Sequence, residues 1–159
     1  MKTNASPQKV VLITGASSGI GKSIGEYLSK HNFKVYGTSR NPAKISHPPF
    51  AMVALDVTQK ETITAAIEQI IAEEGKIDVL INNAGVGITG PIEETPDEEI
   101  VKAFETNYFG PIKVIKAVLP EMRKQNSGLI INITSIAGYM GLPYRGIYSA
   151  SKGALELTT

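Results

Sequence analysis

Short apolar runs alternate with longer stretches of mixed polarity along this chain. The first run, 9–14, is rich in β-branched residues and shows no alternation of apolar and polar positions. A run of this kind is typical of a parallel strand that is buried on both faces. We predict β-strands over 9–14, 33–38, 51–56, 78–82 and 129–134.

The stretches between these runs carry helix signals. Ile63, Ile67, Ile70 and Ile71 recur at helical spacing and would form one apolar face. Thr58 with Glu61, and Thr95 with Glu98, match the capping-box pattern of a helix start. We therefore predict helices from about 21 to 30, over 58–74, from 95 to about 124 with a bend near 107–111, and over 148–159.

Alternating strands and helices indicate an α/β fold with a parallel sheet and right-handed crossovers. The predicted strand order is 3-2-1-4-5, a Rossmann-type doubly wound sheet. In such sheets ligands bind at the carboxyl ends of the strands, beside the switch between strands 1 and 4. This places the loops after Thr14 and after Asn82 at the candidate site.

Composition narrows the possible functions. The chain has 159 residues, a net charge of +1 and no cysteine. Disulfides, thiolate metal sites and a cysteine nucleophile are excluded, and the charge is too small for a nucleic-acid or anionic membrane surface. The polar start and the lack of long apolar runs lead us to expect a cytoplasmic protein with no membrane partner. We expect a flexible tail at 1–8 and one domain over 9–159.

Three glycines separate the first predicted strand from the first predicted helix. Gly15, Gly19 and Gly21 would allow a tight turn and a close backbone approach to a pyrophosphate at the helix N-terminus. The spacing GxxxGxG differs from the commoner GxGxxG. A glycine-rich turn without a ligand is the alternative, which the strand–turn–helix context makes less favourable.

The end of the second predicted strand bears on cofactor choice. Thr38, Ser39 and Arg40 contain no acid that could accept hydrogen bonds from a ribose 2′-hydroxyl. A guanidinium instead matches a phosphate, so Arg40 favours NADP(H) over NAD(H). The alternative is a solvated surface arginine.

Two further patterns are ambiguous when each is taken alone. Asn83, Ala84 and Gly85 close the fourth predicted strand, where they could contact a cofactor or simply form a turn. Tyr148 and Lys152 are four residues apart, hence on one face of a helix, where an ammonium would favour the phenolate. Such a pair also arises by chance.

Ser135 ends the fifth predicted strand and could donate to a substrate carbonyl. Hydrolase chemistry is disfavoured, because no histidine base lies near a strand's carboxyl end and no GxSxG surrounds this serine. His31 and His47 are expected to be solvated, and we expect no metal site.

Together, these motifs resemble the classical branch of the short-chain dehydrogenase/reductase family. The resemblance runs from about residue 9 to the last residue. It is carried by the segments 14–21, 56–57 and 82–85, by Asn107 and Ser135, and by 148–152.

The resemblance implies an oxidoreductase that interconverts a carbonyl and a secondary alcohol by hydride transfer. Its catalytic set would be Asn107, Ser135, Tyr148 and Lys152, with Tyr148 as proton donor or acceptor. Lys152 would also hold the nicotinamide ribose, and Asn107 would position a water through its backbone. The cofactor-binding residues would be Gly15, Ser17, Ser18, Gly19, Ile20, Gly21, Ser39, Arg40, Asp56, Val57, Asn83, Ala84, Gly85, Tyr148 and Lys152.

The chain departs from the family in its length, because the last strands of the family fold would be missing. Strand 129–134 would then be an exposed apolar edge. We expect the N-terminal part of a longer reductase or a truncated form of one. The partner would be a small-molecule carbonyl or alcohol, and a full-length form would be a homo-oligomer. The alternatives are a non-catalytic dinucleotide-binding module and an inactive fragment.

Overall fold

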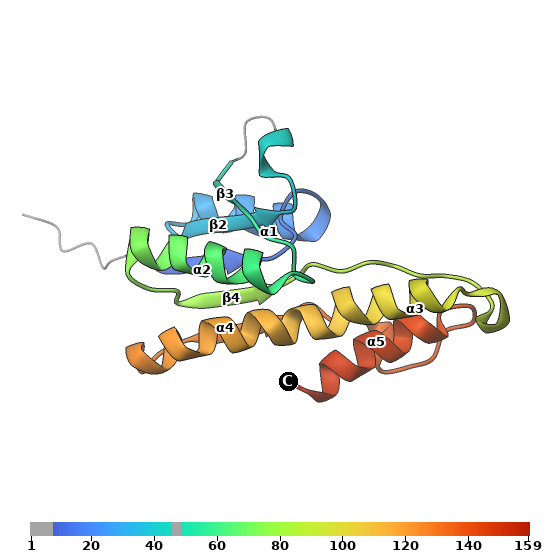
Figure 1. The fold of residues 1–159 in the computed structure, drawn as a ribbon. Helices are drawn as coiled ribbons and strands as arrows, with labels where there is room; N and C mark the ends of the chain where they lie inside the picture. The colour runs from blue at the N-terminus through green and yellow to red at the C-terminus, as the bar shows by residue number, and fades with distance from the viewer. Residues whose placement is uncertain (1–7, 46–48) are drawn as a thin grey trace, which may run out of the picture.

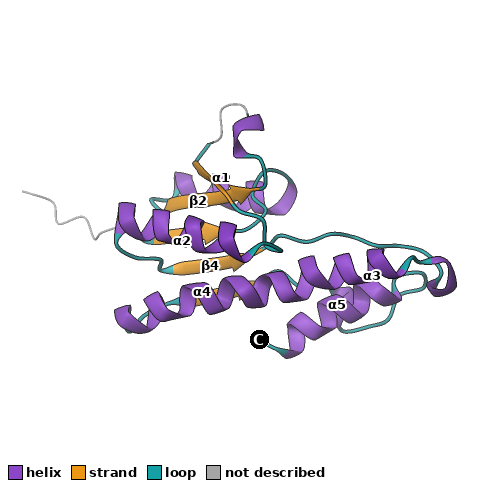
Figure 2. Ribbon diagram, viewed as in Figure 1, coloured by secondary structure: helices purple, strands orange, loops and turns teal. Residues whose placement is uncertain are grey.

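The computed structural model describes residues 8–45 and 49–159, in which five parallel strands form one sheet (Figures 1 and 2). The order is β3-β2-β1-β4-β5, which confirms the predicted topology. Residues 1–7 of the expected tail and His47 lie outside the described residues. The strands are β1 (Val10–Ile13), β2 (Lys34–Ser39), β3 (Ala51–Ala54), β4 (Val79–Asn82) and β5 (Leu129–Asn132).

Within the described ranges, five α-helices connect and cover the strands. They are α1 (Gly19–Lys30), α2 (Lys60–Glu74), α3 (Asp97–Phe104), α4 (Gly110–Gln125) and α5 (Gly146–Leu157). A π-helical turn over Glu105–Phe109 joins α3 to α4 at the position where the bend was predicted. None of the helices in the described part of the chain is both long and apolar enough to span a bilayer.

At β1 both faces of the sheet are covered, which explains the unbroken apolar character of this strand. Val10 and Leu12 pack in a cluster with residues of α2 and α4. Val11 and Ile13 pack in a second cluster, on the side of α1. All four side chains are at most 1% exposed. Full burial of an aliphatic side chain contributes about 1.5–3 kcal/mol, so this central strand anchors both layers.

Neither predicted capping box forms. The Thr58 hydroxyl donates to the Asp56 carboxylate at 2.8 Å, and α2 begins only at Lys60. The Thr95 hydroxyl donates to the Pro91 carbonyl at 2.9 Å, and α3 begins at Asp97. Each helix starts two residues after its threonine, so neither threonine is the N-cap residue.

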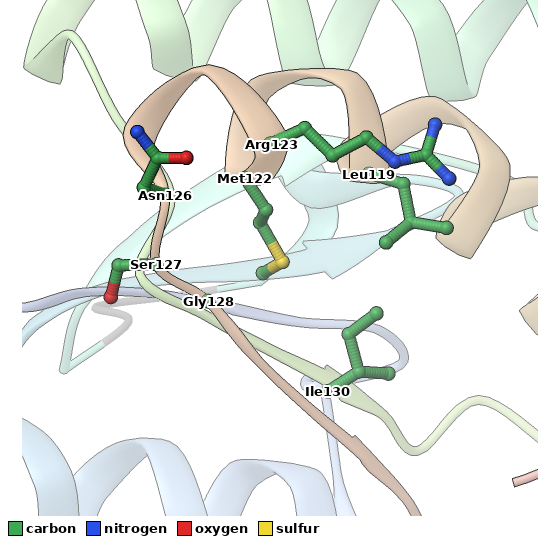
Figure 3. A pocket seen from close by; sticks show the side chains of 7 residues that line it. All are labelled: Leu119, Met122, Arg123, Asn126, Ser127, Gly128 and Ile130. Atoms are coloured by element: carbon green, nitrogen blue, oxygen red, sulfur yellow. The ribbon is translucent and has the colours of Figure 1, made fainter.

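β5 is an open edge of the sheet, as expected from the sequence. Leu129 and Ile131 are 53% and 38% exposed on it. A hollow of about 550 Å³ lies between β5 and the end of α4, where Figure 3 shows Leu119, Met122 and Ile130 pointing inward. The residues 126–128 on its rim precede β5, so the hollow lies at the amino end of that strand, opposite to the edge where α/β sheets bind ligands.

Candidate active site

The loop after β1 packs closely against the loop after β4. Gly15 has φ +66°, a left-handed conformation that glycine adopts without strain. A Cβ added to Gly15 would lie 2.8 Å from the Cα of Ala84, so a larger residue would push the two loops apart. Glycine is therefore required here for both conformation and contact.

Hydrogen bonds lock these two loops together. The buried Thr14 hydroxyl oxygen accepts from the backbone N–H groups of Asn83 and Ala84, both at 3.0 Å. In return, the Asn83 side-chain amide donates to the carbonyls of Thr14 and Gly15, also at 3.0 Å. A Cβ on Gly21 would collide with that amide. The strand-end turn is thus a fixed wall of the candidate site.

The start of α1 is open to solvent. Ser17, Ser18, Gly19 and Ile20 are exposed, and Ser18 precedes the helix without a side-chain cap. No acidic residue lies in the first turn. The first N–H groups of a helix and its dipole favour an anion, and nothing at this N-terminus opposes one.

A cleft of about 310 Å³ extends from this loop across the carboxyl ends of the strands. Of the predicted cofactor residues it brings together Gly15, Arg40, Asp56, Val57, Ala84 and Gly85. Leu55, Thr58, Val86, Lys102 and Thr106 complete its lining.

Arg40 and Asp56 differ in their freedom within the cleft. The Asp56 carboxylate accepts from the N–H and the hydroxyl of Thr58, at 2.9 and 2.8 Å. Arg40 is exposed, and Ser39 before it accepts a hydrogen bond from the Asn41 N–H at 3.2 Å. The guanidinium is therefore the charged group on this wall best placed to meet an anion.

α5 carries the predicted tyrosine and lysine. Lys152 is only 5% exposed, and its Nζ donates to the Ile133 carbonyl at 2.8 Å, just beyond β5. Burial lowers the pKa of its ammonium. Tyr148 lies one turn earlier on α5. In such an environment of low dielectric constant, a positive charge acts strongly on neighbouring groups.

Asn107 sits in the π-helical turn and ties three segments together. Its side chain is fully buried. Its Oδ1 accepts from the Val86 N–H at 2.8 Å, while its Nδ2 donates to the Val86 carbonyl at 2.9 Å and to the Ser151 hydroxyl at 3.0 Å. Ser151 in turn donates to the Tyr148 carbonyl at 2.8 Å. Asn107 thus links the cleft wall to the helix of Tyr148.

Gly85 and the short helix that follows Ser135 lie close to Lys152. A Cβ on Gly85 would lie 3.2 Å from Asn107 Oδ1 and 3.4 Å from Lys152 Nζ. The Ser135 oxygen accepts from the Ala137 N–H at 3.2 Å and starts a short helix, whose Gly138 packs on the backbone of Lys152. Among the described residues, the Ser135 and Tyr148 hydroxyls share no hydrogen bond with each other.

Apolar side chains surround the approach to α5. Tyr144 has φ +60°, a strained conformation for a bulky residue, and its carbonyl accepts from the Gly90 N–H at 2.9 Å. The Arg145 guanidinium lies 5.8 Å from the ring centre of Tyr148. The exposed apolar side chains of the two loops here are Val86, Ile92, Ile136, Tyr139, Met140 and Tyr144.

The sequence reading missed several side chains that build the site. Thr14 ends the first predicted strand with no signal of its own, although its hydroxyl joins the two loops. Ser151 could have been found from its spacing, because a residue three positions after Tyr148 lies on the same face of a helix. Lys102 and Thr106 carry no local signal, because they reach the cleft only through the packing of α3 and the π turn.

The sheet order, the glycine turn at the start of α1 and the site at the strand ends define a Rossmann-type α/β protein. A model of the family described as short chain dehydrogenase matches residues 9–159. The chain therefore belongs to the short-chain dehydrogenase/reductase family, as the sequence motifs led us to expect.

Curated relatives agree with this assignment. The chain is 51% identical over 148 residues to 3-ketodihydrosphingosine reductase of Bacteroides thetaiotaomicron, covering 93% of this chain and 55% of that protein. It is 36% identical over 162 residues to human 17-beta-hydroxysteroid dehydrogenase type 1, covering 92% of this chain and 49% of the relative. The chain thus spans about half the length of the curated relatives it matches.

Solved structures agree in fold. A short-chain dehydrogenase from Streptomyces avermitilis has a TM-score of 0.89 and 38% identity, over 97% of this chain and 59% of the other. A structure of ElxO with NADP bound has a TM-score of 0.87 and 35% identity, over 96% of this chain and 65% of ElxO.

Proposed function

We propose that this chain provides the dinucleotide-binding and catalytic part of an NADP(H)-dependent oxidoreductase that interconverts a carbonyl and a secondary alcohol. The observation that carries the proposal is the buried Lys152 ammonium, one helical turn from Tyr148 and beside the cleft lined by Arg40. Membership in the family and the named activities of its relatives support the same reaction class.

The residues present fit a dinucleotide. Gly15, Ser17, Ser18, Gly19, Ile20 and Gly21 would hold the diphosphate, because they supply a turn without bulk and the free N–H groups of α1. Asp56, Val57 and 83–85 would flank the adenosine. Ser39 and Arg40 would bind a 2′-phosphate, which a guanidinium matches well. The ElxO structure with NADP bound supports this cofactor preference.

A bound dihydronicotinamide supplies a hydride, and this chain's residues supply the proton and the electrostatic field. Tyr148 would give its phenolic proton to the carbonyl oxygen as the alcohol forms, or remove it in the reverse direction. Lys152 would stabilise the resulting phenolate and hold the ribose hydroxyls. Ser135 would donate to the substrate oxygen, and Asn107 would fix the turn against α5.

We further propose an apolar carbonyl compound as the substrate. The exposed side chains of Ile92, Met140 and Tyr144 on the two loops support this class. So does the 51% identity to a protein named 3-ketodihydrosphingosine reductase. Residues 9–159 would form the dinucleotide-binding domain, and the whole protein would act in the cytoplasm as a homo-oligomer.

The test is Tyr148→Phe. Loss of NADPH consumption with a long-chain apolar ketone, together with unchanged NADPH binding, is the expected result. Turnover by Tyr148→Phe at the wild-type rate would contradict the proton-donor role. Binding without turnover in the unsubstituted chain would favour the non-catalytic dinucleotide-binding module.

A further inference from the structure

Two cationic side chains line the cleft: Arg40 directly follows β2, and Lys102 lies on α3. The Lys102 Nζ donates to both oxygens of Glu99, at 3.0 and 3.3 Å. The two side chains are 62% and 51% exposed, and an ion pair that is open to water holds its partners weakly.

The residues that line the cleft offer little negative charge to neutralise the Lys102 ammonium. Asp56 is the one acidic residue among the lining residues, and Thr58 already engages its Oδ1. Glu99 is the acidic partner that Lys102 would have to leave in order to bind an anion in the cleft. A ligand phosphate would offer the ammonium a doubly charged alternative with more acceptor oxygens.

We propose that Lys102 exchanges Glu99 for the adenosine 2′-phosphate of NADP(H), and so shares with Arg40 the discrimination against NAD(H). The inference rests on the proposed function. The diphosphate already has its site at the glycine loop and the start of α1. The phosphate left for the part of the cleft between Arg40 and α3 is the 2′-phosphate. NAD(H) carries a hydroxyl there, which gives Lys102 no anion to bind.

Glu99 therefore competes with the ligand for Lys102, and this competition makes a distinctive prediction. Loss of Lys102 weakens NADPH binding, whereas loss of its competitor Glu99 strengthens it. A general disturbance of α3 would move both variants in the same direction. Changes of opposite sign in NADPH affinity, at two residues one turn apart, therefore distinguish charge exchange from structural damage.

The experiment is a fluorescence titration of the 159-residue chain with NADPH and with NADH. We expect Lys102→Gln to weaken NADPH binding about fivefold and Glu99→Gln to strengthen it about twofold, as exposed ion pairs of this kind allow. Both variants should leave NADH binding unchanged. Lys124→Gln is the matched control, because Lys124 pairs with Glu121 at the same spacing on α4, outside the cleft.

Each other outcome has a distinct meaning. An unchanged NADPH affinity in Lys102→Gln, with NADPH still preferred by the unsubstituted chain, overturns the role of Lys102 alone. Equal weakening of NADPH and NADH overturns the assignment to the 2′-phosphate in favour of the diphosphate. An unsubstituted chain that binds neither dinucleotide, or prefers NADH, overturns the proposed function together with this inference.

Discussion

Replacing Asn107 by alanine tests whether the π-helical turn organises the site. The substitution removes three hydrogen bonds, two to the backbone of Val86 and one to the Ser151 hydroxyl. Each contributes about 1 kcal/mol net, so the three together are worth about 3 kcal/mol. Ser151 keeps its bond to the Tyr148 carbonyl, whereas both backbone groups of Val86 lose their side-chain partner. About 3 kcal/mol is a large share of the 5–15 kcal/mol that holds a typical domain folded.

The assay is urea unfolding followed by circular dichroism, with NADPH binding measured in parallel. Gln69→Ala is the matched control, because this amide is exposed on α2 and donates to Glu73 on the same helix. We expect the control to change the free energy of unfolding by less than about 0.5 kcal/mol. NADPH binding should weaken in Asn107→Ala, since Val86 lines the cleft. A loss of stability below about 1 kcal/mol in Asn107→Ala would refute this reasoning.

Three other substitutions have expected outcomes. Gly21→Ala should lower the free energy of urea unfolding by about 1–3 kcal/mol, because its Cβ meets the Asn83 amide and lies 2.7 Å from the Gly15 carbonyl oxygen. The control Gly87→Ala, whose Cβ would have open space around it, should be nearly neutral. Equal losses of stability in the two variants would contradict the packing argument. Tyr144→Gly should raise the free energy of unfolding by up to about 1 kcal/mol by relieving the positive φ, and a clear loss would mean that the Tyr144 side chain is held by contacts that outweigh the strain. Lys152→Met should stabilise the fold at neutral pH, because burial lowers the lysine pKa below its ordinary 10.5 and the folded state therefore binds that proton less tightly than the unfolded state. That gain should shrink as pH rises towards 10.5, where the unfolded chain also loses the proton, and a pH-independent difference in unfolding free energy would contradict it.

The sequence was sufficient for the topology because each strand carries its own signal. Val10 to Ile13 are apolar without alternation, and the structure buries them from both sides. Gly15 and Gly21 lie where neighbouring atoms leave no room for a Cβ. The glycine motif in the sequence therefore indicated where the loops of the site pack closely. The bend at 107–111 was predicted from the residues Asn107 to Pro111 and proved to be a π-helical turn that ends at Phe109.

Other features depend on contacts that no local pattern encodes. α2 and α3 begin two residues after Thr58 and Thr95, and no local pattern distinguishes these starts from the predicted ones. Lys102 on α3 and Thr106 in the π-helical turn reach the cleft only through tertiary packing. Their roles follow from tertiary placement and could not be deduced from spacing.

The proposed function depends most on NADP(H) binding and on recognition of the 2′-phosphate by Arg40. The most direct measurement is a titration of the chain and of Arg40→Gln with NADPH and NADH, followed by the fluorescence of the reduced nicotinamide. We predict saturable binding with NADPH preferred, and loss of that preference in Arg40→Gln while NADH binding stays unchanged. A preference for NADH in the unsubstituted chain, or an unaltered preference for NADPH in Arg40→Gln, would contradict the claim.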